Sequence, residues 1–242
     1  EGQTTYNLFR EFSKIITKLL STSVIPLLPI YIFGTFMNMT YSGQMFTTLS
    51  IFLKVFVCVI ILHILYISAL FVFAGVLSGK NPFVCMKNQI PGYFTALGTQ
   101  SSAATIPINI ECAKRNGTSP EIREFVVPLC ATIHLAGSII TITSCVVTVL
   151  MMHSMSYGIS TIFPFIMVLG VAMVAAPGAP GGAIMSALPF LGMVGIASSS
   201  PMASLLIALY ITQDSFGTAA NVSGDNAIAI IVDWIYHKFI KK

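Results

Sequence analysis

The chain has 242 residues, of which 55% are hydrophobic and only 8% are charged. Soluble domains carry about 25% charged residues, so this composition excludes an ordinary soluble protein and indicates an integral membrane protein. The net charge of +4 gives no reason to expect a nucleic-acid partner, and the five cysteines are scattered without a CxxC pair. We therefore expect neither a thiolate metal centre nor a disulfide framework. Because the first residue is Glu1 rather than Met, we expect a fragment that lacks upstream sequence.

Four stretches are apolar and long enough to be expected as membrane-spanning helices, since about 20 residues cross the hydrocarbon core. They are residues 18–40, 51–78, 125–152 and 204–236. Two more apolar stretches are interrupted at their centres, by "TQSSAAT" within 83–112 and by "APGAPGG" within 161–195. Short arms around a polar or Gly/Pro tip predict re-entrant helical hairpins, whose irregular backbone must be covered by protein or face water.

The charges support this layout. With both hairpins placed in this way, eleven of the twelve Lys and Arg residues lie on one side of the membrane, and the exception, Lys54, lies at the edge of a span. The positive-inside rule makes that side, with the C-terminus, cytoplasmic. The order hairpin then span occurs in 83–152 and again in 161–236, entered from opposite sides, and such inverted repeats are typical of secondary transporters. We predict three segments: two spans in 1–82, a hairpin with a span in 83–152, and a hairpin with a span in 153–242.

Two aspartates lie in the last predicted span, although no charged residue occurs between Glu124 and Asp214. Asp214, Thr218, Asn221 and Asp225 are spaced by 4, 3 and 4 residues, which places them on one helix face. A carboxylate at bilayer depth costs about 2.5–3.5 kcal/mol, so we expect a function for it. This stripe of oxygens suits a hard cation or an ammonium group. The alternative is two aspartates that bind only neighbouring backbone or lie near the interface.

Three other motifs are candidates. "TQSSAATIP" (99–107) offers hydroxyls and a helix N-terminus, which bind carboxylates, although small residues also serve helix packing. "APGAPGG" (176–182) is expected to be a lid or a simple turn. His134 and a glycine interrupt the third span in "ATIHLAGS" (131–138). This histidine could carry a proton or ligate, and the alternative is a buried, hydrogen-bonded side chain.

These motifs, in this order, resemble those of the dicarboxylate/amino-acid:cation symporter family, which includes the glutamate transporters. "TQSSAATIP" is similar to the family's first hairpin tip, "PLCATIHLAGS" to its unwound seventh helix, "APGAPGGAIM" to its second hairpin tip and "QDSFGTAANVSGD" to its eighth helix. The resemblance implies an all-α membrane fold with helices five to eight and both re-entrant hairpins. It also implies a homotrimer in the plasma membrane, and that the first four helices are absent from this chain.

The resemblance implies a substrate site for an amino acid. Asp214 would hold the substrate's amino group, with Thr218 beside it. Asn221 would contact the main-chain carboxylate, together with Ser101 and Ser102 at the first hairpin tip.

The resemblance also implies a sodium site and no covalent cofactor. Asp225 would ligate sodium, Asn221 would face it, and Cys130 would add a backbone carbonyl. Thr132 would contact a second site. His134 and Ala136 stand where the family motif has asparagine and aspartate, so one sodium site loses a ligand, and H⁺ is a possible replacement for Na⁺.

The substrate class depends on Gly217, which stands where members with acidic substrates carry arginine. Without a guanidinium, a buried side-chain carboxylate has no bidentate partner, so a neutral substrate is favoured. The surroundings of Ser138 are most similar to those in the serine/threonine transporter branch, and Ser138 would face a small hydroxylated side chain.

We therefore expect a transporter rather than an enzyme: a sodium-coupled symporter for a small neutral amino acid that works by alternating access. A cation-coupled symporter for dicarboxylates or acidic amino acids remains an alternative, as does an inactive transporter fragment. An intramembrane aspartyl protease is disfavoured because both aspartates lie on one helix and no GxGD motif occurs.

Overall fold

The computed structural model describes residues 2–19, 22–23, 25–41, 43 and 45–240, and within these ranges every regular element is helical. The chain divides into two compact units, Glu1–Leu49 and Ser50–Lys242. The second unit contains every residue expected to bind substrate or cation.

In the first unit, α1 (Gly2–Leu19) is followed by a short 3-10 turn, η2 (Ile25–Leu27), and by α2 (Leu28–Tyr41). The predicted span over 18–40 is therefore not one continuous helix, although residues 20, 21 and 24 lie outside the described part. Prolines at 26 and 29 account for the interruption, because proline lacks a backbone N–H and disfavours helical geometry in the residue before it. At 1.5 Å per residue, the 14 residues of α2 extend about 21 Å.

Two described helical stretches are long and apolar enough to cross a membrane, Thr48–Ser78 and Pro120–Met152. The first belongs to α3 (Met45–Ser78). The second consists of α6 (Pro120–Ile133) and α7 (Ala136–Met152), which are separated at His134 and Leu135. The interruption thus falls inside the "ATIHLAGS" motif.

Two antiparallel arms form the first helical hairpin, α4 (Pro82–Thr99) and α5 (Ser102–Arg115). Asn81 caps α4, and Gln100 ends it in a left-handed conformation with a φ of 51°. Ser101 then caps α5 with its hydroxyl. The polar tip lies where the sequence predicts it.

The second hairpin has unequal arms. Its first arm is α8 (Ile159–Ala172), extended by the 3-10 turn η3 (Met173–Ala175). The returning arm begins with only a short helix, α9 (Gly182–Ala187), and continues as the 3-10 helix η4 (Leu188–Val194). The tip between the arms contains Pro177 and Pro180, which the sequence analysis placed at the centre of this stretch.

The last predicted span, 204–236, is also divided, and this corrects the expectation of one long helix. α10 (Pro201–Ile211) ends in a turn at Thr212 and Gln213, and α11 (Asp214–Ile235) begins directly after it. Asp214 is thus the first residue of a helix, where a carboxylate is favoured by the helix dipole. A π-helical turn, η5 (Tyr236–Ile240), follows α11.

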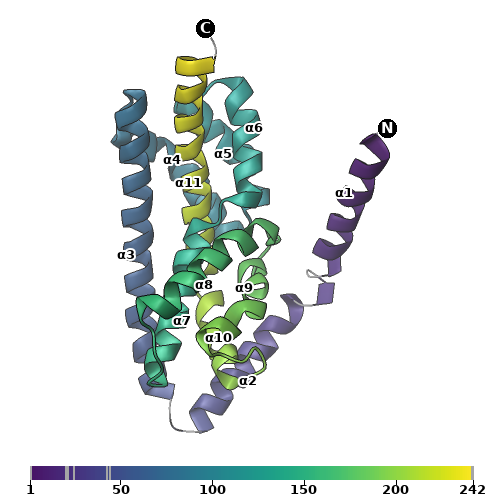
Figure 1. Ribbon diagram of the computed structural model, residues 1–242, viewed down its shortest axis with the longest axis vertical. Helices are drawn as coiled ribbons and strands as arrows, with labels where there is room; N and C mark the ends of the chain where they lie inside the picture. Colours follow the sequence, from purple (N-terminus) through teal and green to yellow (C-terminus); the bar gives the residue numbers. More distant parts are fainter. Residues whose placement is uncertain (1, 20–21, 24, 42, 44, 241–242) are drawn as a thin grey trace. The chain divides into compact units, whose positions relative to one another are not determined.

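Helix α11 is the centre of the second unit, as Figure 1 shows in yellow. It packs against α4, α5, α6 and α7. Many of these contacts involve small residues, such as Ala96 of α4 against Ala219 and Val222 of α11. Small residues let helix backbones approach closely where lipid removes the hydrophobic drive for association. The first hairpin and both halves of the broken helix therefore pack against one central helix.

Candidate functional site

The break between α6 and α7 is held by Asn221 of α11. Its Oδ1 accepts hydrogen bonds from the backbone N–H groups of Gly137, at 2.7 Å, and Ser138, at 3.2 Å. Its Nδ2 donates to the Ser138 hydroxyl at 2.9 Å. The first N–H groups of a helix lack partners within the helix, and a buried end must obtain them elsewhere. Asn221 thus caps α7 from a neighbouring helix and brings Ser138 onto the α11 face.

Two glycines allow α7 and α11 to cross closely. A Cβ placed on Gly137 would collide with the carbonyl oxygen of Gly217 and lie 2.6 Å from Cβ of Ala220. A Cβ on Gly217 would lie 3.2 Å from the Thr141 hydroxyl and 3.5 Å from Cα of Ser138. Position 217 therefore faces Ser138 and Thr141. Gly217 and Ser138, both expected at the substrate site, do lie side by side.

Asp225 lies beneath the same break and is fully buried. Its Oδ1 is 2.8 Å from Nδ1 of His134, and Nε2 of His134 is 2.8 Å from the hydroxyl of Tyr66 on α3. Its other oxygen, Oδ2, is buried and has no hydrogen-bond partner among the described residues. A buried polar atom without a partner is rare and requires an explanation, such as a bound ion.

Asp214 joins α11 to the tip of the second hairpin. Its Oδ2 accepts a hydrogen bond from the N–H of Gly181 at 2.7 Å, and its Oδ1 accepts one from the Tyr210 hydroxyl at the same distance. Gly181 has a φ of 73°, a left-handed conformation that glycine adopts without strain. The carboxylate is buried, yet each oxygen keeps a second lone-pair direction.

The tips of the two hairpins touch each other. The Ser101 hydroxyl accepts a hydrogen bond from the N–H of Ala104 and donates one to the carbonyl of Gly178 at 2.7 Å. Ser102, the next residue, is buried at the start of α5. The serine-rich motif therefore faces the "APGAPGG" tip directly, in an arrangement that closes one tip upon the other.

The three remaining residues that were expected to bind substrate or cation have different surroundings. The carbonyl of Cys130 accepts the N–H of His134 at the end of α6, next to Asp225. The Thr132 side chain is exposed and donates to the carbonyl of Leu129, so it contacts none of the other candidates. Thr218 is buried, and its hydroxyl makes no hydrogen bond within the described part of the chain.

Sequence reasoning did not select Tyr66, Tyr210, Gly181 or Gly224, although each adjoins a candidate side chain. His63 also adjoins the helix break, because its Nε2 lies 3.0 Å from the carbonyl of Gly137. One signal was available: His63 and Tyr66 are three residues apart in a strongly apolar stretch, so they share a helix face.

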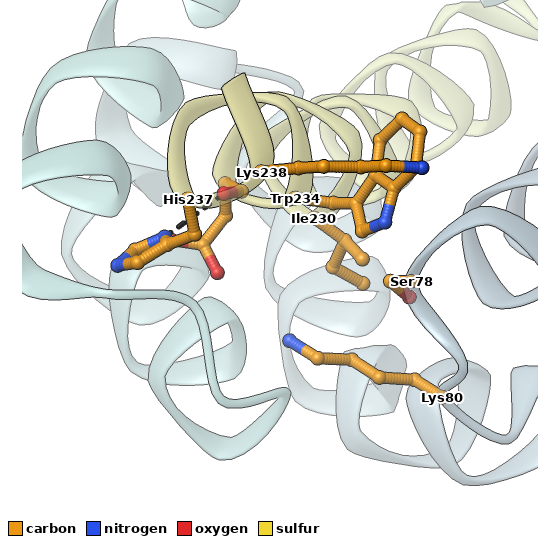
Figure 2. Close-up of a pocket in the computed structure, with 7 residues that line it drawn as sticks. Ser78, Lys80, Ile230, Trp234, His237 and Lys238 are labelled. Carbon is orange, nitrogen blue, oxygen red and sulfur yellow. Dashed lines mark hydrogen bonds and ion pairs between the residues drawn. The ribbon is translucent and has the colours of Figure 1, made fainter. Parts of the chain in front are cut away.

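A pocket of about 350 Å³ lies elsewhere, where the ends of α3 and α11 meet (Figure 2). It is lined by Ser78, Lys80, Ile230, Asp233, Trp234, His237 and Lys238. A second, largely apolar pocket of about 190 Å³ lies between α3 and α4. No residue expected at the substrate or sodium site lines either of these two pockets.

Comparison with known proteins identifies the family. The model of the sodium:dicarboxylate symporter family matches residues 1–235. The chain belongs to this family. The resemblance found in the sequence is thereby confirmed.

Individual relatives are distant and longer. The serine/threonine transporter SstT of Acinetobacter baumannii (strain SDF) is 29% identical over 96% of this chain and 58% of its own length. The protein of the same name from Acinetobacter baylyi is 32% identical over 64% of the chain and 39% of its own length. Excitatory amino acid transporter 1 of Rattus norvegicus is 25% identical over the whole chain and 44% of its own length. The chain therefore spans about half the length of these curated relatives.

The residues present fit a sodium ion at one position. Among the described residues Asp225 Oδ2 has no hydrogen-bond partner, and the other oxygen of Asp225 is held by His134, which follows the last residue of α6. In the described residues, no group of three or more His, Cys, Asp or Glu side chains could hold a metal ion. A cation here would depend on one carboxylate together with neutral oxygens, which suits a hard, weakly bound ion.

Proposed function

We propose that this chain is the substrate-binding portion of a sodium-coupled symporter for a small neutral amino acid. The observation that carries the proposal is that the two buried aspartates of α11 contact different parts of the protein. Asp214 contacts the second hairpin tip, and Asp225 contacts the break between α6 and α7. Two buried carboxylates with separate partners suit two separate positive charges, one on the substrate and one on the coupling ion.

The substrate would bind where the hairpin tips now meet. Its ammonium group would contact Asp214 and displace the N–H of Gly181, which opens the second tip. Its carboxylate would take the hydrogen-bond donors at Ser101 and Ser102, and Asn221 and Thr218 would complete the site. A charged pair of this kind is stronger than a neutral hydrogen bond.

A small side chain suits a site beside Gly217, where α7 and α11 lie close together. That position faces the Thr141 hydroxyl and Cα of Ser138, so a serine or threonine hydroxyl would find a polar partner. No cationic side chain comes from position 217, which disfavours a buried carboxylate on the substrate. The similarity to proteins named serine/threonine transporters supports this choice.

Sodium would bind through Asp225 Oδ2 and the backbone oxygens near Cys130. Because this site and the substrate share α11 and the same helix break, each ligand would raise the affinity for the other, and linkage requires the effect to be reciprocal. A protein that closes only when both sites are filled would carry both ligands together by alternating access. A homotrimeric assembly in the plasma membrane, with a cytoplasmic C-terminus, completes the proposal.

A second candidate is a symporter for acidic amino acids or dicarboxylates. The family description and the similarity to excitatory amino acid transporter 1 favour it. An inactive transporter fragment is a third candidate, because His134 and Ala136 stand where the family motif has asparagine and aspartate.

Uptake by proteoliposomes that contain the complete gene product tests these candidates. We expect an inward sodium gradient to drive the uptake of labelled serine, and unlabelled threonine to compete better than aspartate or succinate. Stronger competition by aspartate or succinate would favour the second candidate. Serine uptake that is independent of sodium would contradict the coupling, and a protein that binds neither serine nor sodium would support the inactive fragment.

A further inference from the structure

Sequence reasoning placed His134 among the metal ligands, but the contacts of its ring indicate another role. That role rests on the proposed sodium site at Asp225. His134 lies between two side chains from different helices, Asp225 on α11 and Tyr66 on α3. The three form one continuous chain of hydrogen bonds, each 2.8 Å long.

The direction of these hydrogen bonds follows from the chemistry of the groups. An ionised carboxylate only accepts, so Nδ1 of His134 carries the hydrogen and donates it to Asp225 Oδ1. In a neutral imidazole the other nitrogen, Nε2, then accepts from the Tyr66 hydroxyl. Both nitrogens are therefore occupied, and neither has a lone pair free for a cation.

A glycine on α11 makes room for the ring. A Cβ on Gly224 would collide with Cε1 of His134 and lie 3.2 Å from the Tyr66 hydroxyl. Alanine is better than glycine inside a helix by roughly 1 kcal/mol, so glycine at this place costs helix stability. The His134 ring fills the space that the missing side chain of Gly224 leaves, which indicates that the position of this ring matters to the protein.

The result for Asp225 is an oriented carboxylate. One oxygen is held by His134, which fixes the plane of the group, and the other oxygen is left buried without a partner. Residues that hydrogen-bond to a metal-binding side chain fix its orientation, and they commonly govern the affinity for the metal in this way.

We propose that His134 is a positioning residue that orients Asp225 toward sodium rather than a ligand of the ion, and that Gly224 and Tyr66 hold its ring in place. Of the two Asp225 oxygens, only Oδ2 binds sodium. The three side chains join α3, the helix break and α11, so the cation site includes a contribution from α3.

A matched pair of substitutions tests the donor. In His134→Asn, the amide nitrogen replaces Nδ1 at the same point of the side chain, whereas His134→Leu has similar size and no donor. The measurement is the sodium-dependent rise in the thermal unfolding temperature of the purified complete protein, fitted for an apparent sodium Kd. We expect His134→Asn to stay within about threefold of the wild type and His134→Leu to weaken sodium binding about tenfold or more, as for a lost hydrogen bond to a charged group.

Two further variants test the ring position without altering the donor. Tyr66→Phe removes one hydroxyl and should weaken sodium binding about three- to tenfold. Gly224→Ala should weaken it at least as much, because the new methyl group displaces the ring. Serine affinity at saturating sodium should change by less than about twofold in both, which a general loss of structure would not allow. Tyr93→Phe and Gly170→Ala are the matched controls, since the Tyr93 hydroxyl has no hydrogen bond among the described residues and a Cβ at Gly170 meets no atom within 4 Å.

The outcomes separate this inference from the proposed function. If wild-type protein responds to sodium and His134→Leu, Tyr66→Phe and Gly224→Ala respond equally, the positioning role is wrong while the sodium site stands. If His134→Asn weakens sodium binding as much as His134→Leu does, a hydrogen-bond donor at this position does not govern the affinity, and the inference is also overturned. A wild-type protein that shows no sodium response overturns both.

Discussion

Nδ1 of His134 lies 2.8 Å from Oδ1 of Asp225, although 91 residues separate them along the chain. This contact joins the break between α6 and α7 to the central helix α11. It satisfies one carboxylate oxygen and leaves the other buried without a partner. The same helix presents Asp214 to the second hairpin tip, so one rigid element serves both ends of the proposed site.

The crossing of α7 and α11 depends on the absence of a side chain at Gly137. Gly137→Ala should destabilise the protein by about 1–3 kcal/mol, because the methyl group would collide with the Gly217 carbonyl and the backbones would have to separate. Thermal unfolding of the purified protein in detergent measures this loss. Gly98→Ala is the control, since a Cβ there meets no atom within 4 Å. Equal unfolding temperatures for both variants would show that the close crossing is not required.

Loss of charge at Asp214 should affect the substrate rather than sodium. Asp214→Asn keeps the size of the side chain but removes the partner of the ammonium group, so serine affinity should fall about 10- to 100-fold. The sodium-dependent rise in unfolding temperature should persist, because Asp225 has its own partners in another part of α11. Isothermal titration with serine at saturating sodium measures the change. Serine binding with wild-type affinity would exclude Asp214 as the anchor of the amino group.

Position 217 should control the charge of the substrate. Gly217→Arg introduces a guanidinium next to Ser138 and Thr141, so it should lower serine uptake and raise the ratio of aspartate to serine uptake by tenfold or more, about 1.4 kcal/mol of discrimination. Parallel uptake assays with the two labelled substrates measure the ratio. Gly217→Ala is the steric control, because its Cβ would make a tight contact of 3.2 Å with the Thr141 hydroxyl but adds no charge. An unchanged ratio in the arginine variant would refute the assignment of Gly217.

A buried network of amides should hold the first hairpin on α11. Asn226 donates to Gln89 of α4 and accepts from Asn116, which follows α5. Asn226→Ala would leave Oε1 of Gln89 buried without its hydrogen bond, whereas Nδ2 of Asn116 would keep the Cys85 carbonyl, so we expect it to lower the free energy of unfolding by about 1–3 kcal/mol. Thermal unfolding measures the loss. Ser223→Ala should be nearly neutral, because that hydroxyl donates only to the Ala219 carbonyl within its own helix.

Local sequence signals located most helices and both hairpin tips. The expected hairpin over 83–112 corresponds to α4 and α5, and its tip falls at Gln100 and Ser101. Polar residues within an apolar stretch, and glycine or proline at a turn, act through nearby backbone and can therefore be read from a short window. The ordered motifs also sufficed to name the family, which the family model confirms.

Helix boundaries were predicted less well. The stretches 18–40 and 204–236 are each predominantly apolar, so hydropathy alone predicts continuous spans. In the structure α11 begins at Asp214, after a turn in which Gln213 donates to the Leu209 carbonyl. A helix ends where its terminal groups find other partners, and those partners depend on the surrounding packing.

The sequence by itself determined that this chain is helical, has the composition of a membrane protein and belongs to the sodium:dicarboxylate symporter family, and that Asp214, Asn221 and Asp225 share one face of a helix. Composition, periodicity and the order of the motifs carry that information because they can be read along the chain without knowing which segments pack together. Only the tertiary structure decided which groups meet those side chains: Gly181 and Tyr210 at Asp214, and His134 at Asp225. A buried carboxylate takes its partners from whichever helices pack against it, and that choice is made by the fold as a whole.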